Sequence, residues 1–178
     1  EHDHKLGSEI KIEANVVEKN TILVNATLLY DFVRKLPNGN VYFETDAKGF
    51  LIIKSENAEI KLVTTDGSAF PQLPRLQISE KLEVSSLVLK DMLKLTIFAA
   101  SLDEKLVHMN STLLEVGEDK LTMVSCELQR IAVKEAYLKH DLPEAARKKY
   151  LIPLRASSEL YKILQQVEDN VIVEIHLS

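Results

Sequence analysis

Hydrophobic residues recur along the chain at two spacings, one typical of helices and the other of strands. In the segment 28–36 they follow the i, i+1, i+4, i+5, i+8 spacing of a single buried helix face. Pro37-Asn38-Gly39 follows directly, and proline cannot continue the hydrogen-bond ladder of a helix. The pattern predicts an amphipathic helix with one buried stripe, formed by Leu28, Leu29, Phe32, Val33 and Leu36.

A second amphipathic helix is predicted after Ser85-Ser86, since serine is a favoured N-cap. Its apolar side comprises Leu87, Leu89, Met92, Leu93, Ile97 and Phe98. Shorter alternating segments predict strands, with turns between them at 46–48, 56–57 and 117–119. The predicted strands are Tyr42–Thr45, Gly49–Lys54, Ala58–Val63, Ser111–Val116, Lys120–Ser125 and Ile131–Ala136. The charged stretch 139–149 is expected to cross the surface.

Two segments far apart in the chain, 22–36 and 150–164, resemble each other. Each has a short apolar strand, a turn and an amphipathic helix, and an alternating strand follows each at 41–44 and 171–174. This predicts a duplicated strand–helix–strand unit, although any two such units look somewhat alike. The fold class expected is α+β, with antiparallel sheets and amphipathic helices on one face.

Residues 66–78 are the best candidate for a linker. Two prolines in Phe70-Pro71-Gln72-Leu73-Pro74 favour extended chain and disfavour helix. We therefore expect two portions with separate cores. Their predicted limits are 1–72 and 80–178, with 73–79 as the linker.

Composition narrows the class of protein. The 178 residues carry a net charge of −5, which argues against a uniformly basic nucleic-acid binder but allows one basic face. No apolar run reaches the length of a membrane helix, and no signal peptide is visible. Cys126 is the single cysteine, so an internal disulfide is excluded. A reduced, cytoplasmic location without membrane attachment is expected.

The order of these motifs resembles the bacterial DNA sliding clamps, the beta subunit of DNA polymerase III. The resemblance rests on the helix at 28–37 with Phe70-Pro71-Gln72-Leu73-Pro74, on Thr96–Glu104, and on the strands that follow. It implies a DNA-clamp fold that starts within the first of three similar domains and ends within the second. The first half of domain one, the last strands of domain two and all of domain three would be absent.

The resemblance gives a role to the basic residues on the predicted helices. In the clamp family such helices line the central hole, where cations meet phosphates without reading bases. An ordinary solvated helix face is the alternative. The DNA-binding residues expected are Arg34, Lys35, Lys90, Lys94, Arg155 and Lys162.

The resemblance also implies a cleft for peptides of the polymerase III catalytic subunit and the clamp loader. Its residues here would be Met109, Cys126, Leu128, Arg130 and Ile131. The chain departs from the family pattern, because Leu128 stands where the family has glycine and Leu106 where it has arginine. Weak partner binding is therefore expected.

Catalytic and metal chemistry find little support. Glu1-His2-Asp3-His4 offers two imidazoles for a metal, and Cys126 with a distant histidine could act as a thiol nucleophile. The simpler interpretations are that the histidine segment binds no metal and that the cysteine only contributes to packing. No catalytic site, metal or cofactor is therefore expected. The expected function is a processivity clamp, homodimeric at full length, that encircles duplex DNA and tethers the polymerase. The alternatives are a degenerate or truncated clamp-like module that closes no ring, and a small hydrolase.

Overall fold

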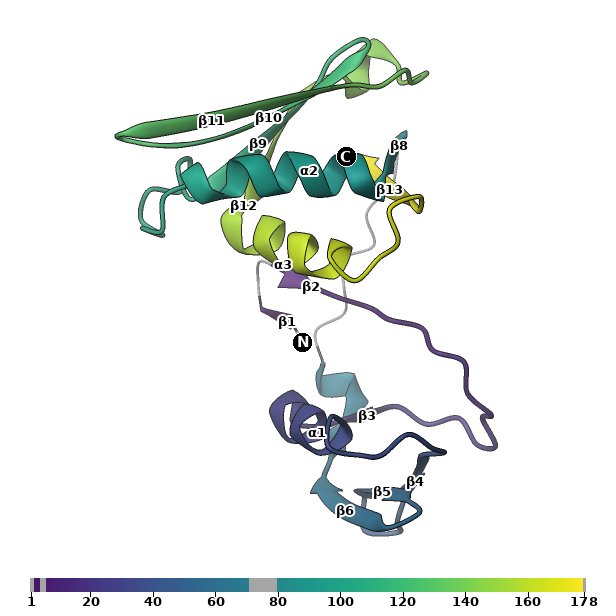
Figure 1. The fold of residues 1–178 in the computed structure, drawn as a ribbon. Helices are drawn as coiled ribbons and strands as arrows, with labels where there is room; N and C mark the ends of the chain where they lie inside the picture. Colours follow the sequence, from purple (N-terminus) through teal and green to yellow (C-terminus); the bar gives the residue numbers. More distant parts are fainter. Residues whose placement is uncertain (1, 4–5, 71–79, 178) are drawn as a thin grey trace. The chain divides into compact units, whose positions relative to one another are not determined.

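The computed structural model describes residues 2–3, 6–70 and 80–177 of the chain (Figure 1). The chain divides into two compact units, with the boundary between Pro74 and Arg75. Each unit has a hydrophobic cluster of its own. The predicted linker 73–79 lies outside the described residues.

The first unit is a small antiparallel meander with one helix. β4, β5 and β6 pair in that order, which confirms the three strands predicted from alternation and turn residues. Leu51, Ile53 and Leu62 form its buried cluster. The elements are β1 (His2–Asp3), β2 (Leu6–Gly7), β3 (Ile22–Leu23), α1 (Ala26–Val33), β4 (Tyr42–Thr45), β5 (Phe50–Ser55), β6 (Ala58–Val63), β7 (Thr65–Asp66) and the 3-10 helix η1 (Gly67–Ala69).

Helix α1 is shorter and less buried than its sequence pattern predicts. It begins where the Asn25 side chain accepts a hydrogen bond of 3.0 Å from the Leu28 backbone N–H, and it ends at Val33. Leu29 and Phe32 pack on the cluster, but Leu28 and Val33 are exposed. The predicted stripe was therefore too wide, because the strands described in this unit cover only one side of the helix.

The second unit places two helices against one face of a four-stranded antiparallel sheet of order β11-β10-β9-β12 (Figure 1). The predicted strand 111–116 is confirmed as β9, and those at 120–125 and 131–136 are confirmed within β10 and β11. The elements are β8 (Glu80–Ser85), α2 (Ser86–Thr96), η2 (Ile97–Ala99), β9 (Ser111–Val116), β10 (Lys120–Glu127), β11 (Arg130–Tyr137), η3 (Glu144–Ala146), β12 (Lys149–Pro153), α3 (Leu154–Leu164) and β13 (Ile172–Leu177).

The strands around α2 and α3 are exchanged reciprocally. β8 enters α2 but pairs with β13, which follows α3; β12 enters α3 but pairs with β9, which follows α2. The duplicated unit predicted from residues 22–36 and 150–164 is present as β3–α1–β4 and β12–α3–β13. A third copy of the unit, β8–α2–β9, was not predicted from the sequence.

The core of the second unit lies between the helices and the sheet. Leu89, Met92 and Leu93 of α2 face Leu121 and Met123 of β10 in one buried cluster. Leu87 and Phe98 were predicted on this side, but both are exposed. Leu87 lies about 200° around the helix from Leu89, and Phe98 belongs to η2 after α2 has ended.

The segment 139–149 is charged but does more than cross the surface. Leu142 and Ala146 are buried in the core cluster. The His140 Nδ1 accepts a hydrogen bond of 3.3 Å from the Leu142 N–H, so its Nε2 carries the proton and donates to the Gly117 carbonyl at 2.9 Å. The ring thereby ties this segment to the β9–β10 turn.

None of the helices described is long and apolar enough to cross a membrane.

Candidate functional site

The two cations predicted on the first helix lie just past its end. Arg34 is the C-cap residue of α1 and Lys35 follows it. The prediction placed both residues within the helix, and the helix ends before them. The Arg34 guanidinium lies 3.4 Å from an Asp31 carboxylate oxygen and over the Tyr30 ring at 5.5 Å from its centroid. Lys35 makes no ion pair with any described residue. Lys35 is therefore the freer of the two charges.

Lys90 and Lys94 lie on α2 one turn apart, as predicted, but their surroundings differ. The Lys90 ammonium pairs with the Asp169 carboxylate, and its side chain is only 25% exposed. Asp169 is held there because its carbonyl accepts the Leu87 N–H at 3.3 Å. Within the described chain Lys94 has no ion pair, and its side chain reaches solvent. Of the pair, Lys94 is better placed to meet a phosphate.

Helix α3 carries Arg155 in its first turn and Lys162 in its last. They are seven residues apart, which is two helical turns, so they share a face. Lys162 pairs with Glu159 at 2.7 Å. α2 and α3 contact each other, so Lys94 and these residues belong to one two-helix layer.

The paired cations remain able to bind an anion. Arg34 and Lys162 pair with acids on the surface, three residues away in sequence, and such exposed pairs contribute about 0–1 kcal/mol. A phosphate can therefore displace these carboxylates at small cost. Lys90 is the exception, because its partner Asp169 belongs to a loop that hydrogen-bonds the start of α2.

Four of the residues predicted to form the peptide cleft lie in and around the β10–β11 turn, at one end of the sheet. The fifth, Met109, lies two residues before the start of β9. Cys126 and Ile131 lie directly opposite each other on β10 and β11. Leu128 is in the turn that joins these strands and is 82% exposed. The Arg130 Nε lies 3.0 Å from a Glu127 carboxylate oxygen, which closes the hairpin.

Met109 precedes β9 in a loop fixed by its own hydrogen bonds. The Ser101 N–H donates to the Met109 carbonyl at 2.9 Å, and the Asn110 side-chain amide donates to the Ser101 carbonyl at 2.7 Å. η2, at the other end of this loop, contacts both β10 and β11. Loop and hairpin are therefore anchored to the same end of the sheet.

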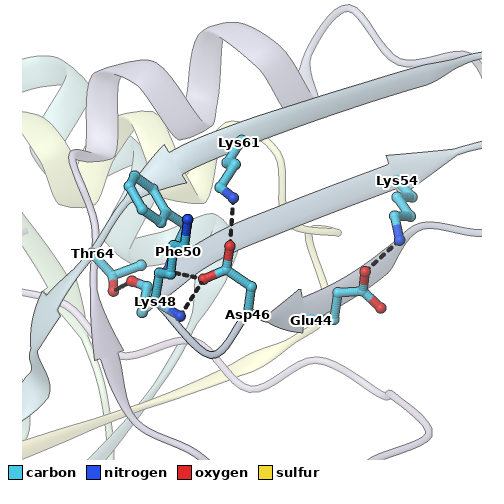
Figure 2. Close-up of polar contacts among 8 residues, drawn as sticks. Glu44, Asp46, Lys48, Phe50, Lys54, Lys61 and Thr64 are labelled. Carbon is cyan, nitrogen blue, oxygen red and sulfur yellow. Dashed lines mark hydrogen bonds and ion pairs between the residues drawn. The ribbon is translucent and has the colours of Figure 1, made fainter.

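An acid–base cluster in the first unit was not singled out from the sequence. The Asp46 carboxylate accepts hydrogen bonds from the Lys48 N–H at 2.9 Å and the Phe50 N–H at 3.0 Å, and it pairs with Lys61 (Figure 2). The Lys61 hydrogen bond and the backbone N–H groups lower the Asp46 pKa from 3.8 to about 2. Glu44 pairs with Lys54 nearby. An Asp-x-x-Gly turn was the signal that could have revealed it.

Two family profiles together cover nearly the whole chain. The DNA polymerase III beta subunit N-terminal domain matches residues 2–74, and the central domain of the same subunit matches residues 83–178. The chain belongs to the DNA polymerase III beta subunit family. Both matches agree with the family inferred from the order of the sequence motifs.

Individual relatives support the same family. The beta sliding clamp of Bacillus subtilis is 28% identical over 162 residues, which are 89% of this chain and 42% of the relative. A putative DNA polymerase III beta subunit from Eubacterium rectale superposes with a TM-score of 0.85 at 28% identity, covering 94% of this chain and 45% of that structure. A beta subunit from Thermotoga maritima shares the fold, with a TM-score of 0.83 at 19% identity, 93% coverage of this chain and 43% of that one. The chain thus spans less than half the length of these beta subunits.

The turn between β10 and β11 contains Leu128, one of the expected departures from the beta-subunit pattern. Leu128 is expected from the resemblance to stand where the family has glycine, and no non-glycine residue described has a positive φ. The turn therefore accepts leucine without the strain of a left-handed backbone. The Leu128 side chain is exposed on the turn that joins the strands of Cys126 and Ile131, so its effect on a bound peptide stays a prediction.

The candidate metal motif at the start of the chain lies only partly within the described residues. Glu1 and His4 of the candidate His-x-His motif lie outside the described residues. Elsewhere in the described chain, no group of three or more His, Cys, Asp or Glu side chains is placed to hold a metal ion. Cys126 faces Ile131 across the strand pair, an apolar neighbour that offers no base.

Proposed function

We propose that this chain is part of a DNA sliding clamp, the processivity factor that encircles duplex DNA and tethers a replicative polymerase. Residues 1–72 would be the C-terminal part of the first clamp domain, 73–79 a linker and 80–178 most of the second domain. The full-length protein would be a cytoplasmic homodimer. The observation that carries the proposal is the match of two successive beta-subunit domains along the chain.

The proposed action on DNA is electrostatic. Long cationic side chains from α2 and α3 would neutralise phosphates and release counterions, which gives affinity without base recognition. Lys94 and Arg155 are exposed on these helices, and Lys35 lies beyond α1. Contacts of this kind let a protein slide along the duplex.

The proposed cleft would bind short peptides of the polymerase III catalytic subunit and the clamp loader. Ile131, Cys126 and Met109 would bury an apolar anchor, and Arg130 would border it, in the manner of an interface hot spot. The protein would work by binding alone, with no catalytic site and no cofactor. The exposed Leu128 and the missing arginine at Leu106 are the features expected to weaken this binding.

DNA binding is the direct test. The chain should bind duplexes of unrelated sequence weakly and equally, and its affinity should fall steeply between about 50 and 200 mM salt. The double variant Lys94→Glu with Arg155→Glu should bind more weakly with a shallower salt slope. The double variant Lys120→Glu with Lys149→Glu makes the same charge change on the sheet strands β10 and β12, so it is the matched control and should change little. Strong preference for one sequence, or equal loss in the control, would contradict the proposed interface.

A further inference from the structure

The outer face of the four-stranded sheet, which faces away from α2 and α3, carries a continuous row of apolar side chains. Val133 lies opposite Val124, Val124 opposite Leu113, and Leu113 opposite Leu151. Each strand thus contributes one residue to what we call the outer apolar row: Val133, Val124, Leu113 and Leu151. Since neighbouring strands lie about 4.8 Å apart, the row is about 14 Å long.

These side chains remain open to solvent although they are apolar. Val133 is 56% exposed and Leu151 45% exposed, while Val124 and Leu113 are half-buried. The alternate residues of the same strands, such as Met123 and Leu114, are fully buried beneath the helices. The core therefore does not account for apolar residues on the outer face.

The borders of the row are chemically distinct. On one side lie polar and charged residues of the same four strands, where Lys120 pairs with Glu135 at 2.7 Å and Lys149 with Glu115 at 3.6 Å. On the other side lie Ile131 and Cys126 of the proposed cleft, two residues along their strands and so about 7 Å away. The row thus continues the cleft, and ion-paired residues bound it.

We propose that the outer apolar row binds an extended apolar segment of the same partner peptide whose anchor occupies the cleft. This inference rests on the proposed function. In an extended segment every second side chain faces one way, and about five residues span the row. Four side chains cover on the order of 300 Å², whereas a stable interface between two protein molecules needs about 800 Å² on each. The size of the row therefore favours a short peptide over a second copy of the chain.

The test compares peptides that share a Leu-Phe anchor and differ in an extension of about five residues. Each pair of peptides consists of one with valine at alternate positions of the extension and one with serine at those positions. In the first pair the extension precedes the anchor, and in the second pair it follows the anchor. NMR titration of methyl-labelled protein measures the affinity and shows which methyl groups respond. In one of the pairs, the valine peptide should bind about tenfold more tightly and perturb Val133, Val124, Leu113 and Leu151.

Three variants separate the row from the cleft. Val133→Lys combined with Leu151→Lys should abolish the advantage of valine but leave binding of the serine peptide unchanged. Leu87→Lys combined with Leu95→Lys, two exposed leucines on α2, adds the same charge, so it is the matched control and should preserve both affinities. Ile131→Lys should weaken both peptides, because it removes part of the cleft.

Each other outcome has a definite meaning. If the serine peptide binds but valine adds nothing, the cleft stands and the row is not a binding surface. If the valine advantage survives the double lysine variant, the extension binds elsewhere and the inference is wrong. If neither peptide binds, or Ile131→Lys changes nothing, the proposed cleft itself fails. Self-association of the chain that the double variant abolishes would assign the row to contacts between copies.

Discussion

The Asp46 carboxylate contributes a defined pH dependence to the stability of the first unit. The Asp46 pKa is lowered to about 2 by the Lys61 hydrogen bond and by two backbone N–H groups, whereas an unfolded chain has an aspartate pKa of about 3.9. A lowered pKa in the folded state means that ionised Asp46 stabilises the fold. This contribution is complete above about pH 4 and is lost as the pH falls to about 2.

Asp46→Asn should therefore lower the free energy of unfolding of the first unit at neutral pH. The difference from the unmodified chain should shrink between about pH 4 and pH 2, because the carboxylate becomes protonated there. Denaturant unfolding at several pH values measures it. Glu56→Gln, at an exposed turn position with no ion pair to a described residue, is the control and should show no such pH trend. A constant difference down to pH 2 would contradict the role given to the carboxylate.

A buried hydroxyl in the second unit has the opposite effect on stability. Ser157 on α3 is fully buried and its Oγ has no hydrogen-bond partner among the described residues, so folding removes it from water without compensation from them. Ser157→Ala should raise the free energy of unfolding by about 1–2 kcal/mol, measured by thermal or urea unfolding. Ser158→Ala in the same helix gains helix propensity alone and should give a smaller increase. Equal gains in both variants would indicate that the buried hydroxyl costs nothing.

At the scale of elements, the sequence predicts those features that depend on residues close together in the chain. The strands β4 to β6 and β9 to β11 alternate regularly and end at turn residues, so their positions were predicted almost to the residue. The burial of α1 and of Leu87 depends on which strands cover each helix, and periodicity alone does not reveal this. The pairing of Lys90 with Asp169 joins residues 79 positions apart, so no local pattern could have shown it.

Helix α1 should depend strongly on its N-cap residue, because its packing is limited. The Asn25 side chain caps the Leu28 N–H, and no residue within α1 is fully buried. Asn25→Ala should destabilise the first unit by about 1 kcal/mol, whereas Asn25→Asp should retain most of the stability because aspartate also caps. Circular dichroism during urea unfolding measures both. Equal losses in the two variants would show that the cap is not the cause.

At the scale of the whole molecule, stability is divided between two separate cores. Ile53 belongs to the cluster of the first unit and Met92 to that of the second, and both side chains are fully buried. Ile53→Ala and Met92→Ala should each cost about 2–5 kcal/mol, but only in their own unit. Native-state amide hydrogen exchange reports the two units separately, so each variant is the control for the other. A loss of protection across both units from either change would show that they unfold together.

The reciprocal pairing of β8 with β13 and of β12 with β9 makes the second unit comparable to a domain-swapped dimer joined into one chain. Neither copy of the strand–helix–strand unit can supply the hydrogen-bonding partner of its own first strand. The partner of β8 is β13 of the other copy, and the partner of β12 is β9. Cleavage between β11 and β12 would therefore leave two fragments that complement each other rather than two small independent domains. The closing ladder joins residues as far apart as Glu80 and Leu177, so the unit completes its fold only after nearly all of it has left the ribosome.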